Sequence, residues 1–148
     1  MNKQQIKDEL RESMFAKDEL KTSVLRMLLS SLSYFEIQKG KGYEATDEDV
    51  LSAIQKEVKQ RNDSIEQFKS AGRNELVKKE EKELEILKKY LPEQMSEEEI
   101  KKLVIDAISQ TNASSMQDIG KVMGYLIPKT KGKADGSLVS KIVREKLS

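Results

Sequence analysis

The stretch Tyr90-Leu91-Pro92-Glu93-Gln94-Met95-Ser96-Glu97-Glu98-Glu99 divides the chain and decides how the helices on each side of it are grouped. The residue before a proline is biased away from helical backbone angles, so Leu91 marks the end of a preceding helix. Ser96 and Glu99 have the spacing of a capping box, in which each side chain accepts a hydrogen bond from the other residue's amide. The pattern therefore predicts a boundary at Pro92 and a new helix just after Ser96.

Before this boundary, apolar residues recur at intervals of three and four, which is the spacing of amphipathic helices. A narrow apolar stripe over residues 6–14 predicts a first helix. A wider stripe over residues 24–35 predicts a second helix that lies centrally. Thr46 and Asp49 form a second capping box, which begins a third helix that ends near Gly72. A fourth helix then runs up to the proline.

After the boundary, the pattern predicts three shorter helices. Ser115 and Asp118 have the spacing of a third capping box and begin the second of them. The predicted helices run from Ser96 to Ile108, from Ser115 to Pro128, and from Asp135 or Gly136 to Leu147. No segment alternates with the period of a strand. We therefore expect an all-α protein, with an N-terminal four-helix domain over residues 1–92 followed by a small C-terminal three-helix bundle over residues 93–148.

The composition removes several kinds of active site. The chain has 148 residues, 36% of them hydrophobic and 36% charged, with no cysteine and no histidine. The commonest general base, the commonest metal ligand and any thiolate are therefore missing. Gly132-Lys133 lacks the glycine and the hydroxyl residue of a Walker A loop, and no serine lies in a Gly-x-Ser-x-Gly elbow. We expect no catalytic residue, no metal and no cofactor.

The location of the protein is predicted from its apolar segments. Residues 1–10 are polar and charged, unlike a secretory signal. The longest apolar stretch, residues 24–32, is too short to span a bilayer. We expect a cytoplasmic protein without a membrane partner, and the sequence makes no prediction of its oligomeric state.

Charge is spread unevenly although the whole chain carries only +1. Residues 93–112 contain two basic and five acidic side chains, a net charge of −3. Residues 113–148 contain seven basic and three acidic side chains, a net charge of +4. The near-neutral total therefore hides a basic C-terminal end.

The basic end contains a candidate anion-binding loop, Pro128–Gly136. In an extended chain its three alternate lysines would point the same way, and the two glycines would let backbone amides approach an anion. The helix that follows Asp135 would offer its positive end. Charge without base contacts suits the phosphate backbone of a nucleic acid. The alternative is an ordinary solvated loop. The candidate nucleic-acid-binding residues are Lys129, Lys131, Gly132, Lys133 and Gly136, extended along the last helix by Lys141 and Arg144.

Four other residues stand out from their helices. Arg61 falls on the apolar stripe of its helix, so we expect it to pair with an acidic neighbour inside the first domain. Arg73 receives no role from the pattern. Gly120 and Gly124 form a Gly-x-x-x-Gly pair, which we expect to allow close helix packing.

Several segments together resemble one family. They are Lys59–Ile65, Ala71–Arg73, Tyr90–Gln94, Ile119–Gly124, Pro128–Gly136 and Val139-Ser140. These segments resemble the YqeY family, whose C-terminal domain is shared with the tail of GatB, a subunit of the tRNA-dependent amidotransferase. The resemblance implies a helical first domain followed by a three-helix tail, and the amidotransferase tail helps to hold tRNA.

The residues and the resemblance together favour a non-catalytic tRNA-binding or tRNA-amidotransferase-related accessory protein. The alternative is a helical protein–protein adaptor that docks a partner through the Gly120 and Gly124 face or the N-terminal bundle. A carbon–nitrogen ligase component with glutamine as amido-N-donor is the least favoured hypothesis. The amidase's Ser-Ser-Lys machinery and the ATP-dependent kinase domain have no counterpart in this chain. We therefore expect that any label of carbon–nitrogen ligase activity attached to the family was inherited by descent.

Overall fold

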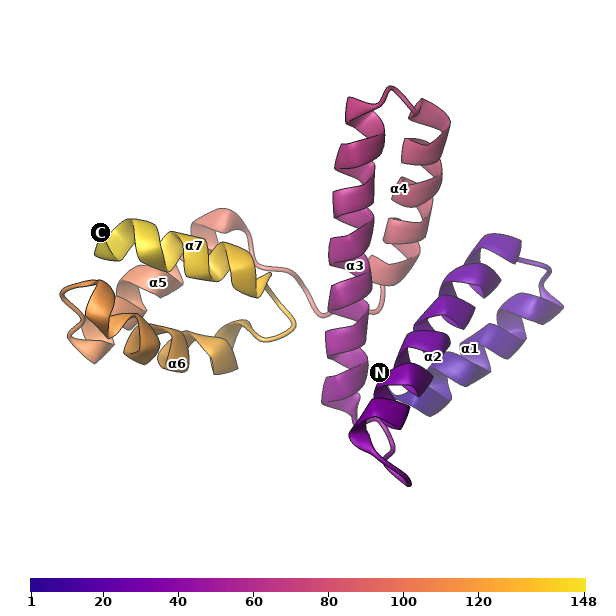
Figure 1. Ribbon diagram of the computed structural model, residues 1–148, viewed down its shortest axis with the longest axis horizontal. Coiled ribbons are helices and arrows are strands. Elements are labelled where there is room, and N and C mark those ends of the chain that lie inside the picture. Colours follow the sequence, from indigo (N-terminus) through magenta and orange to yellow (C-terminus); the bar gives the residue numbers. More distant parts are fainter. The chain divides into compact units, whose positions relative to one another are not determined.

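The computed structural model describes residues Met1–Ser148 and contains seven α-helices and no strand (Figure 1). This confirms the all-α class. The chain forms two compact units, Met1–Leu91 (unit 1) and Pro92–Ser148 (unit 2). That either unit folds as an independent domain stays a prediction. Unit 1 contains α1 (Lys3–Phe15), α2 (Glu19–Lys39), α3 (Asp47–Ser70) and α4 (Asn74–Lys88), and unit 2 contains α5 (Glu97–Thr111), a 3-10 turn (Met116–Asp118), α6 (Ile119–Thr130) and α7 (Gly136–Leu147).

Two of the three capping boxes form as predicted. The Thr46 hydroxyl accepts a hydrogen bond from the Asp49 amide at 3.2 Å, and the Asp49 carboxylate accepts one from the Thr46 amide at 2.9 Å. Ser96 and Glu99 exchange the same pair of bonds at 3.2 and 3.1 Å. Both boxes satisfy amides that have no partner within the helix, and they set the starts of α3 and α5.

The third capping box and the end of the fourth helix were predicted wrongly. Ser115 makes no side-chain cap, because the Asp118 carboxylate accepts instead from the Ser114 amide at 2.9 Å. A 3-10 turn therefore precedes α6, which begins at Ile119. The fourth helix ends at Lys88, and the chain leaves it through turns before it reaches the proline.

Pro128 does not end α6, contrary to the prediction. A proline removes one hydrogen bond, to the carbonyl four residues earlier, and here that carbonyl belongs to the exposed Gly124. The helix continues for two more residues, to Thr130. The Lys131 amide donates to the Ile127 carbonyl at 3.0 Å, so the hydrogen-bond ladder resumes after the proline.

In unit 1, α2 packs against α1, α3 and α4, as expected for the most apolar helix. Its residues Leu25, Leu28 and Leu32 are fully buried against Ile6 of α1 and against α3. A second cluster joins α3 to α4. The helix α2 therefore connects the two helical hairpins α1–α2 and α3–α4, because it packs against helices of both.

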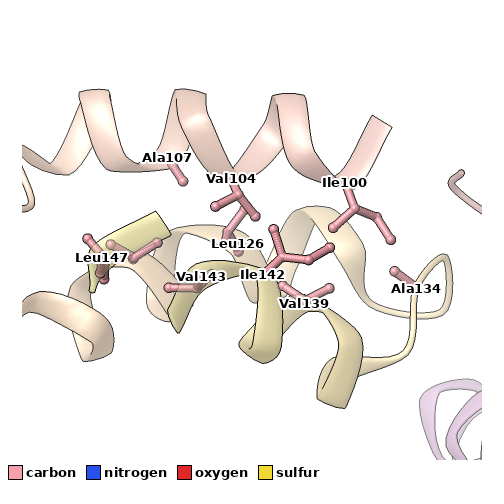
Figure 2. Packing of buried hydrophobic residues seen from close by; sticks show 10 residues of the cluster. Ile100, Val104, Ala107, Leu126, Ala134, Val139, Ile142, Val143 and Leu147 are labelled. Atoms are coloured by element: carbon pink, nitrogen blue, oxygen red, sulfur yellow. The ribbon is translucent and has the colours of Figure 1, made fainter. Parts of the chain in front are cut away.

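In unit 2, one apolar cluster unites the three helices (Figure 2). Val104 from α5, Leu126 from α6 and Val143 from α7 are fully buried in it. Ala134, from the loop before α7, also enters the cluster. The loop is thus attached to the core by its own side chain.

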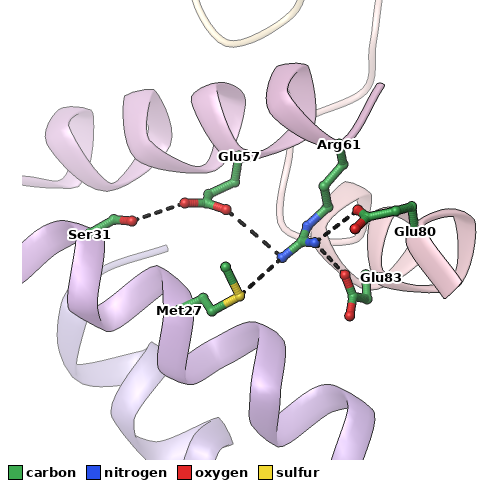
Figure 3. Close-up of polar contacts among 6 residues, drawn as sticks. All are labelled: Met27, Ser31, Glu57, Arg61, Glu80 and Glu83. Carbon is green, nitrogen blue, oxygen red and sulfur yellow. Dashed lines mark hydrogen bonds and ion pairs between the residues drawn. The ribbon is translucent and has the colours of Figure 1, made fainter. Parts of the chain in front are cut away.

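Arg61 is buried in unit 1, with only 6% of its surface exposed. Its Nη1 atom donates to a Glu80 carboxylate oxygen at 3.2 Å and also to the Glu83 carboxylate, both from α4 (Figure 3). Its Nη2 atom lies 3.9 Å from the Glu57 carboxylate, one turn earlier on α3. Arg61 therefore pairs with acidic neighbours, as predicted.

The same cluster reaches α2. The Ser31 hydroxyl donates to Glu57 at 2.9 Å, and the Arg61 Nη2 atom donates to the Met27 sulfur at 3.7 Å (Figure 3). Charged groups deep in a protein are costly unless they are paired. This cluster therefore specifies how α2, α3 and α4 pack. Arg73, in contrast, is exposed, and its Nε lies 3.8 Å from exposed Glu75.

We predict that Arg61→Ala will lower the free energy of unfolding by about 3–5 kcal/mol, because it leaves buried carboxylates without their cation. Urea denaturation monitored by circular dichroism would measure the change. Arg73→Ala is the matched control. It should change stability by less than about 1 kcal/mol, since it removes only a solvated ion pair. Equal effects of the two substitutions would contradict the structural role given to Arg61.

Glu36 of α2 connects this helix to α1 and to the loop before α3. Its carboxylate accepts a hydrogen bond from Lys3 Nζ at 2.5 Å and one from the Ala45 amide at 2.7 Å. The bond from Lys3, followed by that from the Ala45 amide, holds the pKa of Glu36 below its ordinary value of 4.5. A depressed carboxyl pKa stabilises the folded protein above the ordinary value, and this stabilisation is lost as the pH falls through the folded pKa.

We predict that Glu36→Gln will reduce the loss of stability on acidification below about pH 4.5. The measurement is the free energy of urea unfolding across a pH series. Lys3→Met should reduce the same pH dependence, because it removes the main cause of the shift. A pH dependence that both substitutions leave unchanged would show that Glu36 is not linked to folding.

Candidate nucleic-acid interface

The segment Pro128–Gly136 comprises the last turn of α6, a tight turn and the first residue of α7, and the expected extended arrangement of its lysines is wrong. Lys129 lies in the last turn of α6, and Lys131 and Lys133 lie in the turn that follows. Gly132 has a φ of 78°, in the left-handed region that favours glycine. The chain reverses there, because the amides of Lys133 and Ala134 both donate to the Thr130 carbonyl, at 2.9 and 3.0 Å. All three lysines are exposed. Their side-chain directions are set by a helix end and a turn, and not by an extended segment.

The turn is held in place by the segment before α5. Gln94 Nε2 donates to the Gly132 carbonyl at 2.8 Å and to the Pro92 carbonyl at 2.8 Å. The Met95 amide donates to the Lys133 carbonyl at 2.8 Å. The bonds to Gly132 and Lys133 each join residues that are 38 positions apart in the chain, whereas the bond to Pro92 is local. Gln94 is therefore a positioning residue that spacing patterns do not reveal, because its partners are distant in sequence.

This attachment also brings acidic residues towards the turn. Met95 is followed by Ser96 and then by Glu97–Glu99, which form the first turn of α5. The net −3 and net +4 segments are thus joined by the hydrogen bond from Met95 to Lys133, two residues before this acidic turn. The Lys129 ammonium lies 4.9 Å from the centre of the Tyr125 ring, and Tyr125 in turn donates to Asp106 at 3.1 Å. Acidic residues therefore lie in both segments that contact the lysine turn.

The N-terminus of α7 carries its own acidic cap. The Asp135 carboxylate accepts a hydrogen bond from the Ser137 amide at 3.0 Å. It therefore takes a place that an external anion would otherwise take at a helix start. Farther along α7, Lys141 and Arg144 are exposed at a spacing of three and form no ion pair.

The glycines of unit 2 differ in what they require. Gly132 needs its left-handed conformation, whereas a Cβ on Gly136 would meet nothing within 4 Å and its φ is ordinary. Gly120 and Gly124 are exposed, and a Cβ on either would also meet nothing within 4 Å. The expectation that they allow close helix packing is wrong within this chain, because α6 buries Val122 and its neighbours on the opposite side.

Metal sites and membrane spans are two further features that the structure can show. No group of three or more carboxylate, histidine or cysteine side chains gathers where it could hold a metal ion. None of the helices combines the length and the apolar character needed to cross a bilayer.

The comparison with known families covers nearly the whole chain. The family model described as Yqey-like protein matches residues 3–147 of the chain. The chain belongs to the YqeY family. The match includes both halves of the contact described above, Gln94 and the turn at Gly132.

Three relatives of this YqeY-family chain are described by their names and organisms. The Altered inheritance of mitochondria protein 41, mitochondrial, of Saccharomyces cerevisiae is 34% identical over 127 residues, covering 82% of this chain and 68% of the relative. The protein of the same name from Lachancea thermotolerans is 31% identical over 147 residues, covering 95% and 78%. An uncharacterized protein of Schizosaccharomyces pombe is 36% identical over 91 residues, covering 62% and 72%.

These names contradict the cytoplasmic location predicted from the sequence, since the first two relatives are named as mitochondrial proteins. The physical reason for the error is simple. A polar amino terminus argues against a secretory signal, but it does not distinguish one aqueous compartment from another.

We predict that Gly132→Ala will destabilise the protein by about 1–2 kcal/mol, because an alanine in the left-handed region strains the turn. Gly136→Ala, Gly120→Ala and Gly124→Ala are matched controls from the same unit. None should destabilise, and Gly124→Ala, in the interior of α6, should stabilise by about 0.5–1 kcal/mol. Urea denaturation of the four variants would measure this. Similar losses in all four would contradict the distinction between the glycines.

Proposed function

We propose that this YqeY-family protein is a non-catalytic, tRNA-amidotransferase-related accessory protein that binds the phosphate backbone of tRNA through unit 2. The observation that supports the proposal is the exposed lysine turn, held by Gln94 and Met95 against the start of α5. The residues proposed to contact RNA are Lys129, Lys131 and Lys133, with Lys141 and Arg144 extending the surface along α7.

The hydrogen bonds that hold the turn support binding because they reduce its cost. A flexible loop loses conformational freedom when it meets a ligand, whereas a loop already ordered by its own fold loses less. The backbone at Gly132 and Lys133 is already committed by two hydrogen bonds to the preceding segment. Only the lysine side chains then need to be ordered on RNA.

The chemistry of the turn favours phosphate contacts over base recognition. Tyr125 is the aromatic residue nearest in sequence, and its ring and hydroxyl already contact Lys129 and Asp106. Proteins that read unpaired bases offer open aromatic faces for stacking. Charge alone gives binding that depends strongly on salt, and the nearby Glu97–Glu99 should keep its affinity modest.

The residue types present support a role without catalysis. A glutamine-dependent ligase needs an activated nucleophile, and this chain has no cysteine or histidine and no counterpart of the amidase's Ser-Ser-Lys machinery. We therefore propose that any ligase label in the family is inherited by descent. Release of ammonia from glutamine by the purified chain would refute this part of the proposal.

We predict that retention of labelled tRNA will fall steeply as salt rises. Lys129→Ala, Lys131→Ala and Lys133→Ala combined should lower the slope of log affinity against log salt by about 2–3, or roughly one per lost phosphate contact. Filter binding across a salt series measures both slopes.

The control for this experiment is Lys78→Ala, Lys79→Ala and Lys82→Ala combined, which removes three exposed lysines of α4. It changes net charge by the same amount outside the proposed surface. The proposal requires the control to keep the wild-type slope. Equal slopes for the two triple variants, or no retention of tRNA at low salt, would refute it.

The second candidate function is a protein–protein adaptor. Two observations favour it: the open α6 surface beside Gly120 and Gly124, and large apolar side chains exposed on α1 and α2. Proteins rarely leave contiguous apolar surface in water without a use for it. The apolar side chains of α1 and α2 lie in unit 1, apart from the proposed RNA surface, whereas the Gly120 and Gly124 surface shares α6 with Lys129.

A further inference from the structure

Exposed large apolar side chains gather on the α1–α2 hairpin. Phe15 is 82% exposed and Ile37 is 76% exposed, although both are large and apolar. Tyr34 is 65% exposed on the same side of α2 as Ile37. The full set on this hairpin is Met14, Phe15, Met27, Tyr34 and Ile37. Single exposed apolar residues are common, but a gathered set marks a surface made for contact.

The outer side of α2 carries three shallow depressions. They follow one another, the first beside Lys17, the second beside Leu29 and the third beside Gly40. The first and second share Arg26, and the second and third share Ser33 and Ile37. We call this row of adjoining depressions the α1–α2 trough. Because α2 has 21 residues, the trough is about 30 Å long at 1.5 Å per residue.

The sequence of α2 explains the shape of the trough. The helix buries Leu25, Leu28 and Leu32 on one side. On the opposite side, small Ser30 and Ser33 line its floor. The larger side chains of Met27, Tyr34 and Ile37 line it at intervals of a helical turn or two. Small residues between large apolar ones make a groove that the side chains of another helix can enter.

The charges that line the trough are mainly positive and unpaired. Arg26, Lys17 and Lys41 line it, and none of the three has an ion-pair partner. Two acidic residues also line it. Glu36 already accepts bonds from Lys3 and from the Ala45 amide, and Glu19 lies at the start of α2, where the helix dipole favours a negative charge. The trough therefore presents apolar anchors beside free cations.

We propose that the α1–α2 trough binds an amphipathic helix of a partner protein, with its apolar side on Met14, Tyr34 and Ile37 and acidic residues opposite Arg26, Lys17 and Lys41. Charge complementarity selects an acidic partner, and the spaced apolar side chains of the trough select a helix with apolar residues spaced by three and four. Met14 suits such a site, because its half-exposed, flexible side chain can adapt to the residues it meets. The inference does not depend on RNA binding by unit 2.

The test uses the full chain and two designed helical peptides. Both peptides carry leucines at positions i, i+3, i+4 and i+7. Most of the remaining positions are glutamate in the acidic peptide and lysine in the basic peptide. Fluorescence anisotropy of the labelled peptides measures affinity, and amide chemical shifts locate the contact. We expect the acidic peptide to bind more tightly and to shift α2 resonances.

Three variants make the test specific. Ile37→Ser should weaken binding of the acidic peptide by roughly tenfold or more, since it removes a central apolar anchor. Arg26→Glu should weaken it by a similar factor and should narrow the preference for the acidic over the basic peptide. Lys82→Glu makes the same charge change on an exposed residue of α4 and should leave binding unchanged. Circular dichroism confirms that each variant keeps its helices.

Several outcomes would overturn the proposal. The basic peptide could bind as tightly as the acidic one, or Arg26→Glu could bind like the wild type. Sedimentation could show a dimer that Ile37→Ser dissociates, which would assign the trough to a second copy of the chain. Cosedimentation with anionic vesicles, lost on Ile37→Ser, would assign it to a membrane surface. RNA retained by the trough and released by Arg26→Glu would assign it to nucleic acid.

Discussion

The buried guanidinium of Arg61 is the interaction on which the packing of unit 1 depends. One cation from α3 faces carboxylates from α3 and α4, and its remaining contact is the sulfur of Met27 on α2. Each charge is costly in the interior unless the others are present, so the three helices have one arrangement that satisfies all of them. The Arg61 Nε atom is buried without a hydrogen-bond partner, and three carboxylates surround the one cation, so the cluster is less stabilising than a fully paired one would be.

A different constraint organises unit 2. Its helices close around one apolar cluster, and polar bonds from Gln94 and Met95 then tie the lysine turn to the segment before α5. The same bonds that order the turn bring the acidic start of α5 towards it. A surface proposed to bind phosphate is therefore rigid, which favours binding, and lies beside its own counter-charges, which limits binding and discriminates against weakly charged ligands.

The two units offer two surfaces of different chemistry. Unit 2 presents lysines on an ordered turn with no open aromatic face, which suits a polyanion. Unit 1 presents an apolar trough with unpaired cations, which suits an acidic helix. The two proposals together describe a connector, which would bring a nucleic acid and a protein together. Membership of the YqeY family is consistent with the helical architecture and leaves these ligands as proposals.

The sequence by itself determined the helical class, the starts of α3 and α5, and the acidic pairing of Arg61. Capping boxes link residues three apart and apolar stripes repeat within a helical turn, so both can be read locally. Only the tertiary structure decided that α6 continues past Pro128, that the lysine turn is compact, and that Gln94 holds it. These outcomes depend on hydrogen bonds between residues 38 positions apart and on whether an exposed carbonyl can do without a partner, and no local pattern records either.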